Sequence, residues 1–292
     1  MTPNKKILAG INLSHLDEQV ISFTSLLSTI IQPATLIFYH VLKKGSDETD
    51  TIEVRKTEVK HKVVESFGET IPDSAVFLVE SGSPGDLLIK QSKEKNIDLM
   101  VMGRQASESN QNFIESLINA SESSLFLVPE NSTPKITNIV VGIDFSEESH
   151  LCLDTAVIIA NKTGADIHCL NIYHVPSGYH TSGKSYEEYS EIMKNNARKE
   201  ADKFEKKYKY DIPLNFDFRL DDDNDPADKL YEYAQKTNAD LICVGSRGLA
   251  TIAALFFDTT AEKIVEISNN VPMLVVKAKN KHRSFFDAIR EL

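Results

Sequence analysis

The feature that most constrains this chain is a repeat, because its second half restates its first half segment by segment. KKILAGINLS at residues 5–14 matches TNIVVGIDFS at residues 137–146, an offset of 132. LIFYHV matches LNIYHV, and a longer segment beginning SPGDLL matches one beginning DPADKL, in the same order. Self-similarity of this kind predicts two copies of one structural unit in tandem.

Within each copy, short apolar runs rich in β-branched residues alternate with longer stretches of helical periodicity. This alternation is typical of βαβ units and of a mostly parallel, buried sheet. The sequence therefore predicts an α/β fold with two tandem, doubly wound, Rossmann-like domains of five parallel strands each. In the second copy the expected strands are residues 139–143, 167–173, 214–220, 241–244 and 273–276.

Prolines and polar segments indicate where helices and domains begin. Pro84 and Pro226 each open a helical stretch, at a position where the missing N–H is not needed. PENSTP, just after the first copy, suits an interdomain connection. We expect domains over residues 1–131 and 135–279, and a C-terminal tail over residues 280–292.

Composition excludes several classes of partner. The net charge of -11 argues against nucleic acid and anionic lipid, which require lysine and arginine. The longest apolar runs fall far short of the roughly 20 residues of a membrane span, and the first residues lack the pattern of a signal peptide. Cys152, Cys169 and Cys243 form no CxxC pair and lie in apolar stretches, where reduced cysteine behaves as a small hydrophobe. We therefore expect a cytoplasmic protein with no metal site.

The location of a ligand site follows from the fold class. Open α/β sheets bind ligands at the carboxyl ends of their strands, where the strand order reverses. In the second copy, Asp144, Tyr173, His174 and Gly245 stand at or just after such ends. His40 and His174 occupy equivalent positions, but no nucleophile or acid partner lies at diagnostic spacing, and no GxxxxGK motif is present. The sequence therefore predicts binding without a catalytic residue.

The GID turn, the HV pair, the segment DLICVGSRG and the closing AEKIVEISNNVPMLVVK together resemble the universal stress protein family. The resemblance covers nearly the whole chain and is strongest over residues 137–279. Family members that bind ATP carry Gly, two residues, Gly, nine residues, Gly and then Ser or Thr after the fourth strand. Here Gly245 and Gly248 hold the first two places, Asp258 replaces the third glycine, and Thr259 follows.

The resemblance implies ATP, with Mg²⁺, in the second domain. In the ATP pattern, glycines let backbone N–H groups approach phosphate oxygens ahead of a helix N-terminus. Asp258 would cap that helix with the same N–H groups. Two unit charges about 4 Å apart repel by about 1 kcal/mol in water and about 4 kcal/mol at an effective dielectric of 20, which weakens binding about tenfold or more. A bridging metal would offset this, and the alternative is a strand-to-helix turn without a ligand.

The resemblance also implies that Asp144 lies beside the adenosine moiety and that Arg247 faces the phosphates. The alternatives are an Asp144 side chain that caps the helix from Glu147, with Ser146 as a rival cap, and a solvated Arg247.

The first copy fits the ATP pattern much less well. Gly103 is present, but Ala106 replaces the second glycine and Asn12 replaces the aspartate. The interval from Gly103 to Ser124 is also six residues shorter than that from Gly245 to Pro272. We expect this half to be a partner domain with a degenerate nucleotide site.

Residues 221–232 partly match the calcium-binding loop of an EF-hand. Acidic residues occupy its positions 1, 3, 5 and 12, but Pro226 stands where the calcium loop needs glycine. A solvated strand-to-helix connection is favoured. The four acidic residues are Asp221, Asp223, Asp225 and Glu232.

Together these features predict a stress-response protein that binds adenine nucleotide in its second domain and acts through association. The alternatives are a nucleotide-independent interaction protein and a slow ATPase. Family members typically pair through their fifth strands, so residues 125–128 and 273–276 would pair either within one chain, as a pseudo-dimer, or across a homodimer.

Overall fold

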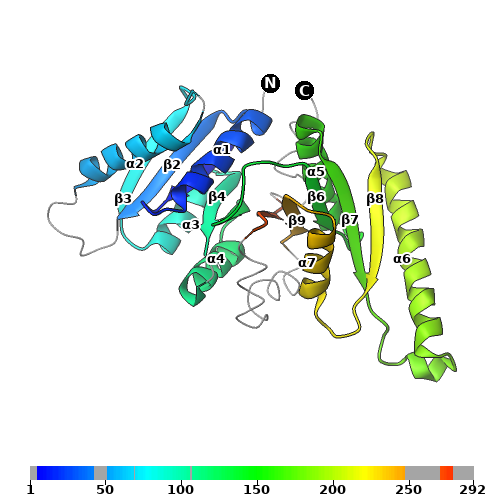
Figure 1. Ribbon diagram of the computed structural model, residues 1–292. Coiled ribbons are helices and arrows are strands. Elements are labelled where there is room, and N and C mark those ends of the chain that lie inside the picture. The colour runs from blue at the N-terminus through cyan, green and yellow to red at the C-terminus, as the bar shows by residue number, and fades with distance from the viewer. Residues whose placement is uncertain (1–4, 43–50, 69, 106, 247–269, 279–292) are drawn as a thin grey trace. The chain divides into compact units, whose positions relative to one another are not determined.

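The computed structural model describes residues 5–42, 51–68, 70–105, 107–246 and 270–278. Contacts divide the chain into two compact units, Met1–Lys135 with Thr260–Leu292, and Ile136–Thr259. Each unit is a mostly parallel sheet with helices packed on it (Figure 1), so the α/β fold class is confirmed. The domain limits expected from the repeat stay a prediction.

The first unit has the strand order β3-β2-β1-β4-β5-β10. β1 to β5 are parallel to their neighbours, and β10 is antiparallel to β5. The strands are β1 Lys6–Ile11, β2 Thr35–Leu42, β3 Ala75–Ser81, β4 Leu99–Arg104, β5 Ser124–Pro129 and β10 Met273–Val276. The helices are α1 Asp17–Ile31, α2 Ile52–Ser66, α3 Pro84–Glu94 and α4 Glu108–Ala120.

The second unit has the strand order β9-β6-β7-β8, with every pair parallel. The strands are β6 Asn138–Gly142, β7 Asp166–Tyr173, β8 Leu214–Leu220 and β9 Leu241–Gly245. The helices are α5 Glu147–Thr163, α6 Tyr186–Tyr208 and α7 Pro226–Lys236, with a short 3₁₀ turn, η1 Tyr179–Ser182, before α6.

β10 completes the sheet of the first unit. Met273 pairs with Leu127, and Leu274 pairs with Phe126. Every residue of both strands is buried, and apart from Ser124 both are runs of apolar residues, as expected for strands covered on both faces. The two expected fifth strands therefore pair within one chain, an arrangement that the sequence left open.

Local sequence signals explain where several helices begin. α3 and α7 start at Pro84 and Pro226, as predicted. The long α6 starts with a capping box, in which the side chains of Ser185 and Glu188 each accept from the other residue's backbone N–H. These caps satisfy amide groups that a helix start otherwise leaves without partners.

The core of each unit consists of its strands and the apolar faces of its helices. In β4, Leu99, Met100 and Val101 are fully buried. Among the described helices, none combines the length and the apolar content that a membrane span needs.

Candidate functional site

The ends of β6 and β9 form one edge of the second unit's sheet. The two strands are parallel, with Val141 paired to Cys243, so their carboxyl ends are neighbours. Gly245 ends β9, and Asp144 lies two residues beyond the end of β6. The structure thus brings these two predicted site residues to one edge. The other four, Arg247, Gly248, Asp258 and Thr259, lie outside the described residues.

Asp144 does not cap the helix that follows it, so that alternative was wrong. Ser146 is the N-cap of α5 and accepts from the backbone N–H of Ser149 at 3.2 Å. Asp144 instead accepts from the backbone N–H of Ser146 at 2.9 Å, across Phe145, which has a left-handed φ of 64°. Partial burial raises the pKa of Asp144, but hydrogen bonds from Ser146 and Ser149 outweigh it and hold the pKa below its usual value. Asp144 is therefore an ionised acceptor at the strand edge.

Gly245 lies against the first turn of α5. A β-carbon added to Gly245 would meet Cβ of Glu148 at 3.6 Å, which is ordinary van der Waals contact. Packing against the described residues therefore does not require glycine at this position.

The acidic connection between β8 and α7 is satisfied internally. Asp221 accepts from the backbone N–H of Asp225 at 2.9 Å, and Asp225 caps α7 by accepting from the N–H of Asp228 at 3.0 Å. Nζ of Lys229 pairs with Asp222 at 3.4 Å and with Asp223 at 3.1 Å. Within the described residues, no group of three or more His, Cys, Asp or Glu side chains is placed to hold a metal ion.

The first unit contains a cavity of about 940 Å³ at the carboxyl ends of β1, β2 and β4. Helices α1, α2, α3 and α4 and the loops after β1 and β4 supply the rest of its wall. The sequence predicted a degenerate site here and named none of its polar side chains as ligand-binding. These include Asp17, His40, Arg55, Gln105 and Asn110.

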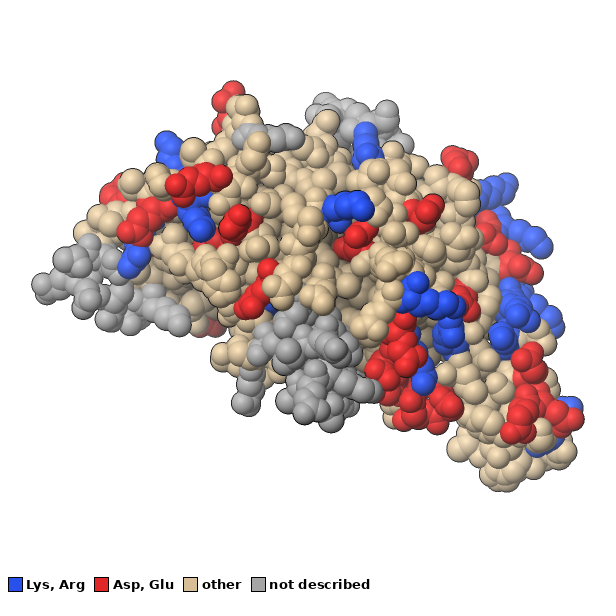
Figure 2. Space-filling model, viewed as in Figure 1, with Lys and Arg blue, Asp and Glu red and all other residues tan. Residues whose placement is uncertain are grey.

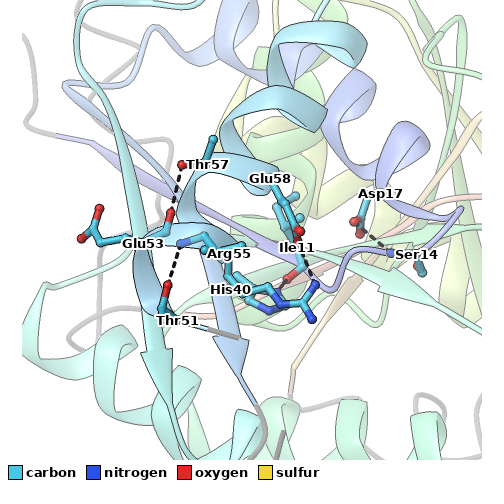
Figure 3. Close-up of polar contacts among 10 residues, drawn as sticks. Ile11, Ser14, Asp17, His40, Thr51, Glu53, Arg55, Thr57 and Glu58 are labelled. Carbon is cyan, nitrogen blue, oxygen red and sulfur yellow. Dashed lines mark hydrogen bonds and ion pairs between the residues drawn. The ribbon is translucent and has the colours of Figure 1, made fainter. Parts of the chain in front are cut away.

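His40 is buried in the wall of this cavity, and its ring is fixed by one hydrogen bond (Figure 3). Nδ1 lies 2.8 Å from the carbonyl oxygen of Ile11. Because a carbonyl only accepts, Nδ1 carries a proton, and in the neutral ring Nε2 is the acceptor.

Asp17 holds the loop that follows β1. Its carboxylate accepts from the backbone N–H groups of Asn12 and Ser14, each at 3.1 Å, and the second bond is drawn in Figure 3. Burial raises the pKa of Asp17, although backbone hydrogen bonds and the nearby charge of Lys62 oppose the shift. The equivalent position in the second unit is Ser149, which has no carboxylate to accept from the loop amides. The loops after β1 and β6 are therefore held by different hydrogen bonds.

Two further polar side chains of the wall are bonded to groups of the protein. Arg55 pairs with Glu58, with 2.7 Å between Nη1 and Oε2 (Figure 3). The hydroxyl of Tyr39 donates to Glu80, which also accepts from Nε2 of Gln91 at 3.0 Å. Burial and the charge of Glu80 raise the pKa of Tyr39 above its ordinary value. The tyrosine hydroxyl is therefore fixed as a donor.

Sequence reasoning missed this cavity because it compared the first copy with one ligand pattern. The signal available was the HV pair at His40, which stands at a strand end in both copies. The volume itself depends on how far four helices stand from the strand ends, and no motif encodes that distance.

On the face drawn in Figure 2, acidic and basic side chains are intermixed, including along α6.

Comparisons with known proteins agree with this fold. The sequence model of the universal stress protein family matches residues 135–277. A universal stress protein of Methanocaldococcus jannaschii is 26% identical over 146 residues, which are 49% of this chain and 83% of that protein.

Two solved structures share the fold over nearly their whole length. A universal stress protein of Archaeoglobus fulgidus has 17% identity and a TM-score of 0.63, covering 95% of this chain and 97% of that one. A functionally unknown protein of Pseudomonas aeruginosa has 15% identity and a TM-score of 0.63, covering 94% and 93%.

The parallel sheets, with candidate sites at the carboxyl ends of their strands, define a Rossmann-like α/β protein. The match to the family model places the second half of the chain, residues 135–277, in the universal stress protein family.

Proposed function

We propose that this protein binds adenine nucleotide, as ATP with Mg²⁺, at the edge formed by β6 and β9, and acts in stress response through binding and association. The observation that carries the proposal is Gly245, which ends β9 at the same sheet edge as Asp144, at a place where packing against the described residues does not require glycine. Gly248 and then Asp258 and Thr259 continue the ATP pattern in the sequence.

Each residue of the proposed site would contact a different part of the nucleotide or of its binding loop. Asp144 is an ionised acceptor that suits the hydroxyl groups of a ribose. Gly245 and Gly248 let backbone N–H groups approach the phosphates, and Arg247 supplies a positive charge there. Asp258 competes with phosphate for the amides of the following helix, so the affinity of the parent protein is weak.

Calorimetric titration of the full chain with Mg-ATP tests this proposal. We expect weak binding by the parent, about tenfold tighter binding by Asp258→Gly because a repelling charge is removed, and none by Gly245→Val because its branched side chain fills the approach to the loop. Gly178→Val is the matched control, since a β-carbon at Gly178 meets no atom of the structurally described part of the chain within 4 Å. The control should bind as the parent does.

Two other outcomes separate the remaining functions. If neither the parent nor Asp258→Gly releases heat of binding with Mg-ATP, the result would favour a nucleotide-independent interaction protein. Phosphate release above background that disappears in Gly245→Val would instead indicate a slow ATPase.

We further propose association within the chain rather than between chains, and a cytoplasmic location. The pairing of β5 with β10 supports the first, since it occupies an edge that a second molecule would otherwise use. The second is supported by three cysteines that are free and buried, as in reducing compartments.

A further inference from the structure

The cavity of the first unit differs from a phosphate site in what its loops offer. After β1, the backbone N–H groups of Asn12 and Ser14 donate to the carboxylate of Asp17, and Ser14 also donates to Oδ1 of Asn12. Phosphate sites of α/β proteins depend on loop amides of this kind being available to the ligand. Here the carboxylate of Asp17 already accepts hydrogen bonds from these amides.

The loop after β4 is satisfied in the same way. The backbone N–H of Gln105 donates to Oδ1 of Asn110 at 2.9 Å, and the N–H of Asn110 is directed to Oγ of Ser107 at 3.4 Å. In both loops the backbone N–H groups therefore donate to side-chain oxygens of the protein. An anion would have to displace these side chains to bind the same N–H groups.

The charges that line the cavity also disfavour an anion. Asp17 and Asp86 contribute carboxylates, and Asp86 stands in the first turn of α3, where it already complements the helix dipole. Arg55 is ion-paired with Glu58. Among the described lining residues there is no lysine. A triphosphate would thus meet two carboxylates and one cation that is already engaged.

The remaining surface of the cavity suits an uncharged ligand. Nε2 of His40 accepts in the neutral ring, and Ser83 and Ser109 contribute hydroxyl groups. Apolar side chains from several elements and the β1–α1 loop form much of the remaining wall, as in most small-molecule sites of about 300–1,000 Å³. They include Leu13, Val20, Met102 and Phe113.

We infer that the first unit binds an uncharged ligand that combines an apolar or aromatic ring with hydroxyl groups, the chemistry that nucleosides and aryl glycosides share. The ring lies against the apolar wall, and the hydroxyl groups bond His40 and the serines. This site is separate from the nucleotide site proposed for the second unit. It also gives the first unit a binding role of its own.

Titration calorimetry with adenosine and with phenyl β-D-glucoside as uncharged probes tests the inference on the full chain. Gly85→Leu and Ser116→Leu fill the cavity from α3 and α4, and both positions suit a helix former. A β-carbon on Gly85 makes only ordinary contacts, the nearest at 3.8 Å from Oγ of Ser116, and both residues line the cavity. Gly178→Leu places the same change on the open surface of the second unit as a control.

We expect at least one uncharged probe to bind the parent and Gly178→Leu, and to bind each filled variant about tenfold more weakly or not at all. Binding of adenosine should survive in Gly245→Val, and binding of Mg-ATP should survive in Gly85→Leu. Loss of binding at one site is therefore measured independently of binding at the other. Binding of adenosine alone identifies a nucleoside site, and binding of the glycoside alone identifies a sugar site.

Several results would overturn the inference. One is the absence of binding of both probes to the folded parent at millimolar concentration. Another is binding that is unchanged in both filled variants while thermal unfolding shows that they are folded. A third is tighter binding of ATP than of adenosine by Gly245→Val, because the cavity would then accept the phosphates that its loops and charges disfavour.

Discussion

Gly103 and Gly245 stand at equivalent places near the ends of β4 and β9, but the space beside their α-carbons differs. A β-carbon on Gly103 would lie 2.4 Å from Cδ2 and 2.8 Å from Cγ of Leu16, whereas one on Gly245 meets no atom of the described residues closer than 3.6 Å. Leu16 is buried and cannot swing into solvent. Gly103 is therefore explained by packing, without any ligand.

The contrast predicts different costs for the same substitution. Gly103→Ala should lower the free energy of unfolding by about 1–3 kcal/mol, since the added methyl forces Leu16 and α1 to shift. Gly245→Ala should stay within about 0.5 kcal/mol of the parent. Urea denaturation of both variants measures the difference, and equal midpoints would contradict the packing role of Gly103.

At the residue scale, the sequence predicted the helix starts at Pro84 and Pro226 but not the cap of α5. Asp144 and Ser146 are both good capping residues, so propensity could not choose between them. The choice depended on the left-handed Phe145, which turns the backbone between the two. Similarly, the retained Gly103 fitted a ligand pattern in the sequence, and only the position of Leu16 revealed its packing role.

At the scale of elements, Lys277 links β10 to the end of α4. Its Nζ donates to the carbonyl oxygens of Ile118 and Ser121, and its backbone N–H donates to Oγ of Ser124 at 3.1 Å. Burial lowers the pKa of Lys277 to about 8, although Glu122 opposes the shift. The ammonium group thus caps a helix end where a positive charge is favoured, but at a desolvation cost.

This lowered pKa predicts a pH-dependent stability. Between the folded pKa of about 8 and the ordinary value of 10.5, the unfolded chain binds a proton at Lys277 that the folded chain does not. The unfolding free energy of the parent, relative to that of Lys277→Met, should therefore rise with pH across this window and be lowest below it. Denaturation curves at several pH values measure the difference.

Lys90→Met removes an amine at an exposed helix position and serves as the control for the loss of one lysine. A parent-minus-variant difference for Lys277→Met that is flat, or that falls as the pH rises, would show that burial does not disfavour the charged amine.

At the scale of the whole molecule, the repeat predicted the tandem organisation but could not choose the partner of residues 273–276. Both fifth strands are apolar runs without alternation, and such runs pair equally well with a strand of the same chain or of another. The fold class was readable because it depends on periodicity, which is local. Strand partnership depends on tertiary placement.

The pairing of β10 with β5 predicts that the full chain is a monomer in solution, measured by light scattering after size exclusion. Leu274→Pro removes a backbone donor opposite Phe126 and opens the edge of β5, so this variant should form dimers or larger species. Leu274→Val keeps the ladder and should remain monomeric. A parent that is itself dimeric would show that the chain associates through another surface.

The same strand order has a consequence for synthesis on the ribosome. β5 emerges early, but its neighbour β10 is translated only after the whole of the second unit. Until then the nascent first unit carries the open edge of the six-residue strand β5, whose unpaired backbone groups can pair with other unfinished chains. Slow translation of the second half would therefore extend the period in which a chaperone has to cover β5.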